Sequence, residues 1–110
     1  MKVTITSIEL KSYLKFFALS MYALNIMKQL KTTNYKGFKK KGFWTKHYTM
    51  TLWNNEEDMI SFAKSGAHLK AMKESSKIAK EIRSTTINSD IFPTWKEAKI
   101  LLQKGKVYKF

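Results

Sequence analysis

The sequence predicts an α+β fold in which helices cover an antiparallel sheet, and three observations support this prediction. The length of 110 residues suits one domain, 1–110, and is too short for two ordinary domains. Along the chain, segments whose apolar residues recur at every second position are followed by segments in which they recur every three or four. Hydrophobic residues make up 44% of the chain and aromatic residues 14%, which is enough for one core and excludes wholesale disorder.

The first strand and the first helix follow from a change of period near the start of the chain. Val3, Ile5 and Ile8 give an apolar side to a predicted strand. From about Ser12 the spacing becomes helical. The apolar stripe of this helix comprises Tyr13, Phe16, Phe17, Met21, Leu24, Met27 and Leu30. Because further apolar residues lie outside the stripe, we expect the helix to be covered by its own sheet and by a partner chain.

A β-hairpin is predicted after this helix. Its first strand covers Tyr35–Lys40, the turn lies around Lys41–Gly42, and the second strand covers Phe43–Trp53. Apolar and polar residues alternate along the second strand, so its side chains divide between two faces. One face holds Trp44, Lys46, Tyr48, Met50 and Leu52, and the other holds Thr45, His47, Thr49, Thr51 and Trp53.

The rest of the chain continues with helices and strands. Asn54, Asn55 and the three carboxylates after them predict a helix start, because asparagine caps helices and acidic side chains favour the positive end of the helix dipole. We expect this helix to be interrupted at Ser65–Gly66 and to resume from Ala67 to about Ile82. Three more elements are predicted: a strand over Arg83–Ile91, a helix from Pro93 to Lys104 with a capping box at Thr94 and Glu97, and an edge strand over Val107–Phe110.

The predicted elements occur in the order β-α-β-β-α-β, followed by an extra helix and a short strand. This is the order of the ferredoxin-like fold, an antiparallel sheet with helices on one face. Because the other face of such a sheet must be hidden, we expect two identical sheets to pair in a homodimer.

The charge is strongly basic. Lysine and arginine total 21 against 8 acidic residues, so the net charge is +13. Arg83 is the single arginine, and arginine rather than lysine makes the bidentate contact that distinguishes guanine. The lysines are spread along the chain, with one cluster at Lys39–Lys41. We therefore favour a lysine-rich solvated surface over a dedicated nucleic-acid site, and a nucleic acid or other polyanion stays an alternative partner.

Composition also narrows the compartment and the chemistry. The chain has no cysteine, which excludes a disulfide scaffold and a thiolate metal site. Two histidines are too few for a structural zinc site, and no phosphate-loop or dinucleotide motif occurs. The longest uncharged stretch, Phe16–Met27, is shorter than the roughly 20 residues that a bilayer span needs. We expect a cytoplasmic protein with no bound metal and no membrane partner.

One region of the chain resembles a known superfamily. The strand end Tyr48–Trp53, the acidic helix start Asn54–Met59, Phe62 and the segment Ser65–Met72 are similar to the dimeric α+β-barrel superfamily, and within it to antibiotic-biosynthesis-monooxygenase-like proteins. The segment Pro93–Ala98 also resembles the closing helix of a group near the spheroidene-monooxygenase-like proteins.

The resemblance implies a homodimer whose sheets form a barrel, with a small-molecule pocket between helices and sheet in each subunit. Its members include cofactor-free oxygenases, haem-degrading enzymes, haem peroxidases and isomerases, so it implies a fold more sharply than a reaction. In the haem-degrading members, the ligand histidine corresponds to Met72 of this chain and the pocket tryptophan to Phe62. Because His68 lies one helical turn before Met72, a shifted haem ligand stays an alternative.

Few residues have side chains suited to chemistry. His68 follows the glycine break on an otherwise apolar helical face. In a functional interpretation, His68 orients a substrate, transfers a proton, or ligates a metal or haem. In the structural alternative, it is a hydrogen-bonded core histidine that caps the broken helix. The acidic run Glu56–Asp58 is interpreted as a solvated cap. The predicted catalytic residues are His68 and Trp53, and the predicted ligand-binding residues are Trp44, His47, Tyr48, Phe62 and Met72. For the aromatic residues, packing in the core or at an interface is the competing interpretation.

The leading hypothesis is a homodimeric, monooxygenase-like enzyme that acts on a small apolar or aromatic substrate without a tightly bound cofactor. The first alternative is a haem-binding or haem-degrading protein. The second is a binding module without enzymatic activity, whose basic surface meets a polyanion.

Overall fold

The computed structural model describes residues 1–110, with the exception of the side chain of Phe43. Its elements, in chain order, are β1 (Lys2–Leu10), the short 3-10 helix η1 (Tyr13–Lys15), α1 (Phe16–Leu30), β2 (Gly37–Phe43), β3 (Lys46–Trp53), α2 (Glu56–Ala63), α3 (Gly66–Glu74), the 3-10 helix η2 (Ser75–Lys77), β4 (Ala79–Asn88), α4 (Trp95–Leu102) and β5 (Lys106–Lys109). The strands form one sheet in the order β2-β3-β1-β4-β5, and all neighbours are antiparallel. The predicted ferredoxin-like α+β fold is confirmed.

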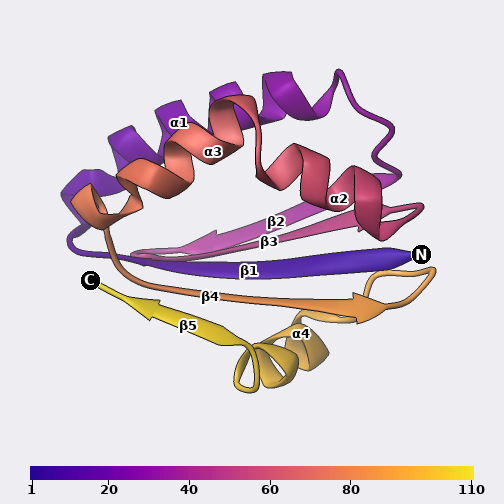
Figure 1. Cartoon of the computed structure of the whole chain (residues 1–110). Coiled ribbons are helices and arrows are strands. Elements are labelled where there is room, and N and C mark those ends of the chain that lie inside the picture. Colours follow the sequence, from indigo (N-terminus) through magenta and orange to yellow (C-terminus); the bar gives the residue numbers. More distant parts are fainter.

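Helices lie on both faces of the sheet. Figure 1 shows α1, α2 and α3 together on one face, which we call the helix layer, and α4 on the opposite face. The extra helix predicted near the end of the chain is α4, and it covers the face of the sheet opposite to α1, α2 and α3. Its Ala98 and Leu102 are buried against Val3, Ile5 and Met50. As a result, α4 hides part of the sheet surface that was expected to require a second copy of the chain.

The inward face of α1 differs from the predicted stripe. Leu19 and Tyr22 pack toward the cluster around β1 and β4, whereas Phe17, Met21 and Leu24 are exposed, Phe17 by 79%. Apolar residues surround this helix on nearly every side, so the 3.6-residue period fits more than one stripe. Tertiary packing therefore decides which stripe is buried.

The hairpin between β2 and β3 turns later than predicted. The turn is formed by Trp44 and Thr45 rather than by Lys41–Gly42. Trp44 has a φ of 59° and is 69% exposed. Gly42 instead lies in β2, where a Cβ atom would lie 2.3 Å from Nδ1 of His47. The glycine thus permits a close approach of the imidazole, and the sequence pattern alone does not distinguish that role from a turn.

The expected interruption at Ser65–Gly66 is confirmed, since α2 ends at Ala63 and α3 begins at Gly66. The continuation of the second helix to about Ile82 is wrong. The α3 helix ends at Glu74, and β4 begins at Ala79 rather than at Arg83.

Packing against β1 explains the earlier start of β4. Ala79 pairs with Leu10 across the antiparallel ladder, and both residues are buried in one cluster with Ile78. Apolar residues at positions 78, 79 and 82 fit a helical stripe and a short strand equally well, so their spacing is ambiguous.

The last helix begins as predicted. The Thr94 hydroxyl accepts a hydrogen bond from the Glu97 amide at 3.1 Å, and the Glu97 carboxylate accepts one from the Thr94 amide at 3.3 Å. This is the capping box that the sequence predicts. Among the described residues, no helix has the length and apolar character to cross a membrane.

Removal of the Thr94 cap is expected to destabilise the fold. Thr94→Ala removes the hydroxyl acceptor at the start of α4, so the free energy of unfolding should fall by about 1 kcal/mol. Thr94→Ser keeps the hydroxyl and serves as the matched control. Urea denaturation measures both variants, and an equal loss in the two would contradict the assigned cap.

Candidate functional site

The break between α2 and α3 places His68 in the first turn of α3. The imidazole Nδ1–H donates a hydrogen bond to the carbonyl oxygen of Ala63, with an N–O distance of 3.0 Å. A carbonyl oxygen only accepts, so Nδ1 bears the proton and Nε2 of the neutral ring has a lone pair available. None of the described residues makes a hydrogen bond to Nε2. Every fully buried polar side-chain atom of the described residues has a hydrogen-bond partner, so Nε2 is not fully buried. It follows that Nε2 is reachable from outside the protein.

Burial lowers the pKa of His68 below its ordinary value of about 6.5. Loss of hydration disfavours the charged ring and is the larger cause, while the hydrogen bond to the Ala63 carbonyl acts in the opposite direction. The imidazole is therefore neutral at pH 7 and can accept a proton at Nε2.

Two predicted site residues form a row of rings with His68. The Phe62 ring lies 5.0 Å from the imidazole and 5.3 Å from the Trp53 ring, measured between centroids. Trp53 is 1% exposed and shares a buried cluster with Phe62 and Leu30. We refer to Trp53, Phe62 and His68 as the aromatic row. It links the end of β3 to the helix layer.

The sheet beneath the helix layer is unusually polar. Trp53 contacts α2, and alternation places Thr51 and Thr49 on the same face of β3. On β1, the Thr4 hydroxyl donates to the sulfur atom of Met59 in α2 and lies 3.5 Å from the Thr86 hydroxyl. The strand register groups six such side chains into two rows across β3, β1 and β4. This hydroxyl surface consists of Thr51, Thr4 and Thr86 in one row and Thr49, Thr6 and Ser84 in the other.

The hydroxyl surface indicates that water enters between the layers. Five of its residues are half-buried and Thr86 is exposed. Four of these hydroxyls have no hydrogen-bond partner among the described residues, namely those of Thr6, Thr49, Thr51 and Ser84. Every fully buried polar side-chain atom of the described residues has a partner, so these four hydroxyls are not fully buried. These hydroxyls consequently remain accessible and can bind water or the polar groups of a ligand. Sequence analysis did not single them out, although the pattern of a hydroxyl residue at every second position was a usable signal.

The other predicted binding residues lie elsewhere. The His47 ring is near the hairpin turn, where Nε2 lies 3.1 Å from the Trp44 carbonyl oxygen and the ring packs against Phe16. Tyr48 faces the opposite side of the sheet, 6.4 Å from the ring of Trp95. Met72 follows His68 by one turn of α3 and is 53% exposed. Of the predicted binding residues, the structure brings Phe62 into contact with His68 and does not bring His47, Trp44 or Tyr48 there.

Hollows open on the surface on either side of the sheet. One has a volume of about 430 Å³, lies between the end of α1 and α2, and includes Trp53 and Phe62 in its lining. The other has a volume of about 420 Å³, lies on the α4 side of the sheet, and is lined by Tyr48, Arg83 and further charged residues. His68 lines neither hollow, so the first reaches the aromatic row only at its Trp53–Phe62 end.

The described residues contain no group of three or more histidine, aspartate or glutamate side chains placed to bind a metal ion. A haem group would need an axial ligand facing a large space. Neither of these hollows has a histidine in its lining, so neither offers an axial histidine ligand to a haem bound there.

Comparison with solved structures supports the fold. A proposed antibiotic biosynthesis monooxygenase from Nitrosomonas europaea superposes with a TM-score of 0.71 at 12% identity, covering 83% of this chain and 100% of that one. A conserved protein from Methanosarcina mazei gives a TM-score of 0.72 at 8% identity, with coverage of 81% and 92%. SnoaB, a cofactor-independent oxygenase from Streptomyces nogalater, gives 0.62 at 5% identity, with coverage of 84% and 96%.

This chain has the antibiotic-biosynthesis-monooxygenase-like fold. The resemblance inferred from the region around Trp53 and His68 is thus confirmed at the level of the α+β-barrel fold. No protein-family model and no curated protein sequence matches the chain. Identities of 5–12% establish the fold only, and the reaction must be argued from the site.

The protonation of His68 is directly measurable. Because the folded pKa is lowered, the unfolded chain binds more protons than the folded chain between the folded pKa and about pH 6.5. The stability contribution of His68 is therefore complete above about pH 6.5 and is lost as the pH falls toward the folded pKa. NMR titration should show a pKa below 6.5 and a proton on Nδ1, with His68→Gln used to assign the signals. A pKa at or above 6.5, or a proton on Nε2, would contradict this site geometry.

Proposed function

We propose that this protein is a monooxygenase-like enzyme that binds a small apolar or aromatic molecule between the helix layer and the sheet, without a tightly bound cofactor. The observation that supports this most is the neutral imidazole of His68, whose Nδ1–H is engaged by Ala63 and whose Nε2 is free. The aromatic row offers an apolar contact beside it, and the hydroxyl surface lies on the facing sheet. An apolar site with a few polar groups is typical of small-molecule binding.

In this proposal His68 is the catalytic base. Nε2 accepts a proton from a C–H or O–H group of the substrate, while the hydrogen bond from Nδ1 to Ala63 fixes the orientation of the ring. That hydrogen bond also stabilises the imidazolium that forms after proton transfer. Because the base works only in its neutral form, the rate should rise as the pH increases through the lowered pKa of His68 and then level off.

The proposed reaction uses electrons from the substrate itself, as the description of SnoaB as a cofactor-independent oxygenase suggests for a protein of this fold. Proton loss to His68 leaves a carbanion stabilised by a neighbouring carbonyl or aromatic ring. The carbanion reduces O₂. A substrate methylene becomes a carbonyl, one oxygen atom of O₂ enters the product and the other leaves as water. The substrate therefore needs an acidic C–H bond on an oxygenated aromatic framework.

The remaining site residues receive distinct roles. Phe62 contacts the imidazole and forms an apolar wall for the substrate. Trp53 is almost completely buried, so it supports Phe62 from behind rather than touching the reacting atoms. Met72 lies on the same face of α3 as His68 and is half-exposed, which suits the rim of the site.

We also propose a homodimer, which the exposed apolar residues on the α4 side support. Ile100 on α4 and Val107 on β5 are 52% and 40% exposed there. A second copy that covers these residues would complete the barrel implied by the resemblance. Light scattering after gel filtration should give a mass of two chains, and a mass of one chain would contradict this part of the proposal.

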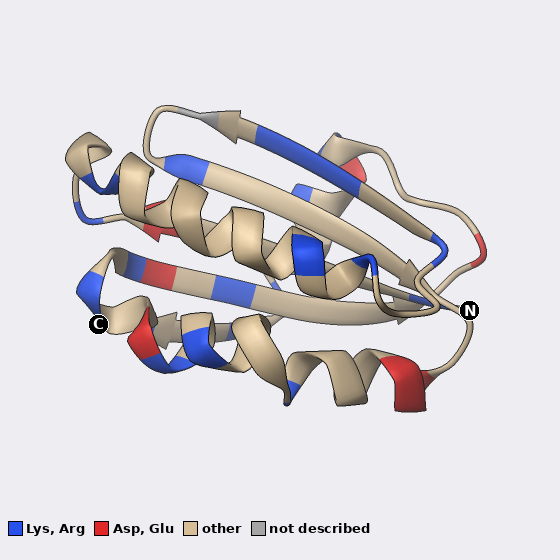
Figure 2. Ribbon diagram, turned by 90° about the horizontal axis from the view of Figure 1, so that it is seen from above, with Lys and Arg blue, Asp and Glu red and all other residues tan. Residues whose placement is uncertain are grey.

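A polyanion-binding role receives less support. Figure 2 shows the basic stretch Lys39–Lys41 on β2, the edge strand. Strand alternation directs Lys40 to the opposite face from Lys39 and Lys41, and the ammonium of Lys39 stacks over the Phe92 ring. The three lysines therefore do not form one continuous patch.

The enzymatic proposal is tested with oxygenated aromatic compounds. Anaerobic titration of a panel of hydroxynaphthalenes and aromatic ketones should quench the tryptophan fluorescence of the protein. Readmitted O₂ should then be consumed with formation of one carbonyl and one water per turnover. His68→Ala should lower the oxygen-consumption rate by about 100-fold or more, because it removes the base. His47→Ala should leave the rate unchanged, since His47 lies near the hairpin turn.

Three results would contradict the proposal. They are the absence of binding across the panel, a rate in His68→Ala equal to that of the wild type, and a dependence on His47 in place of His68. Addition of haem in a parallel titration should produce no Soret shift, and a shift lost in His68→Ala would favour the haem alternative instead.

A further inference from the structure

The α3 helix begins without a cap from its own sequence. Ser65 occupies the N-cap position with extended backbone, but its side chain accepts no hydrogen bond from the first turn. Instead, the Ser65 hydroxyl donates to the carbonyl oxygen of Ser61 at 2.7 Å. The first-turn amides of a helix have no partner within the helix. The amide of His68 therefore needs an acceptor from another part of the chain.

Gln29, in the last turn of α1, supplies this acceptor. The amide N–H of His68 donates to Oε1 of Gln29 at 2.8 Å. At the other side of the same carboxamide, Nε2 donates to the carbonyl oxygen of Ser65 at 2.8 Å and approaches that of Phe62 at 3.3 Å. One side chain thus serves both the end of α2 and the start of α3, which requires a group that donates and accepts at its tip. Glutamine and asparagine are the side chains that provide such a carboxamide.

The geometry of Gly66 is matched to this contact. Its φ of 57° lies in the left-handed region, which glycine adopts at little cost. A Cβ atom at this position would lie 3.0 Å from Cδ of Gln29. The absence of a side chain at Gly66 therefore lets the carboxamide of Gln29 reach into the break between the two helices.

We propose that Gln29 is a positioning residue for His68, which it holds by the backbone so that the imidazole reaches Ala63 and keeps Nε2 free. The ring makes its own hydrogen bond to Ala63 in the last turn of α2, so two contacts determine its place. The Ala63 bond depends on the relative position of α2 and α3, and Gln29 joins these helices directly. The proposal rests on the proposed function in one respect, namely that the positioned ring is the catalytic base.

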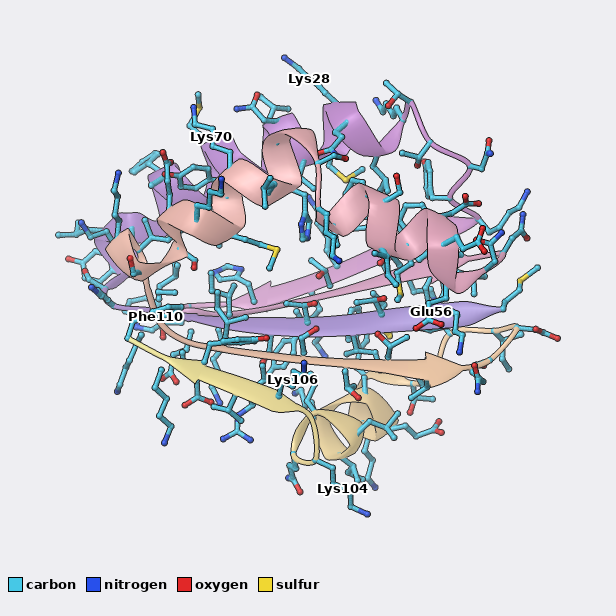
Figure 3. All side chains as sticks on the ribbon, in the orientation of Figure 1. Lys28, Glu56, Lys70, Lys104, Lys106 and Phe110 are labelled. Carbon is cyan, nitrogen blue, oxygen red and sulfur yellow. The ribbon has the colours of Figure 1, made fainter. Side chains whose placement is uncertain are left out.

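Loss of the Gln29 carboxamide should change the hydration and the pKa of the His68 imidazole. Without the Gln29 contacts, the start of α3 separates from the end of α2 and water reaches the imidazole. Burial and the Ala63 carbonyl are the two influences on the pKa of His68, and charged side chains are not among them. Hydration therefore moves the pKa upward, toward about 6.5. Figure 3 shows Lys28 at the end of α1 extending away from the sheet.

The test replaces Gln29 by a residue of similar length without a carboxamide. In Gln29→Met, NMR should show the His68 pKa raised toward 6.5 and a partial loss of the Nδ1-protonated tautomer. The best hydroxynaphthalene should bind about tenfold more weakly, which corresponds to the loss of roughly one hydrogen bond. Gln103→Met is the matched control, because Gln103 is exposed at the C-cap of α4, far along the chain from this break. An unchanged His68 pKa and tautomer in folded Gln29→Met would overturn the proposal.

A second variant keeps the test decisive where Gln29→Met fails to fold. Gln29→Glu retains the acceptor for the His68 amide, so slow exchange of that amide should persist, while the new carboxylate should raise the His68 pKa. Fast amide exchange together with an unshifted pKa would contradict the assignment. The NMR measurements need no ligand. A protein that binds none of the aromatic compounds but shows these His68 shifts would refute the proposed function and leave the positioning role of Gln29 intact.

Discussion

The site depends on one local arrangement, the closure of the break between α2 and α3 around His68. A continuous helix would satisfy every backbone amide internally and would leave no carbonyl for the imidazole to bind. The break frees the Ala63 carbonyl at the end of α2, and the Nδ1–H of His68 occupies it. This single hydrogen bond selects the tautomer, orients the ring and leaves Nε2 as the free nitrogen. Burial then keeps the ring neutral, so a structural contact and a proton acceptor are combined in one side chain.

The two layers on either side of the site are chemically unlike. On the helix side, Phe62 is buried against Trp53 and presents an apolar ring beside His68. On the sheet side, hydroxyl residues occupy positions where an ordinary helix-covered sheet has aliphatic residues. An apolar filling would stabilise the fold more, because burial of apolar area is the main source of stability. The choice of hydroxyls is consistent with a space that accommodates water or an oxygenated ligand. Buried apolar residues lie on both faces of the sheet, with Val3 and Met50 under α4 and Leu10 and Ala79 under the helix layer.

Sequence reasoning was effective where local chemistry decides the outcome and limited where distant packing decides it. Strand alternation and the glycine after Ser65 are local signals, so the order of the elements along the chain, the antiparallel sheet and the helix break were predicted correctly. The end of α3 at Glu74 was not predicted. Ile78, Ala79 and Ile82 also fit a helical spacing, and the pairing of Ala79 with Leu10 in the sheet overrides it. Gln29 gave no signal at all. Its partner His68 lies 39 positions away, and only the folded chain brings the carboxamide to the break.

A crystal structure of the protein with its tightest oxygenated aromatic ligand tests the central claim most directly. The ligand should lie between the helix layer and the sheet, with an oxygen or acidic carbon within hydrogen-bonding reach of Nε2 of His68. One ring face should lie against Phe62 and the polar groups on the hydroxyl surface. A ligand bound only on the α4 side of the sheet beside Tyr48, with the surroundings of His68 unaltered, would contradict it.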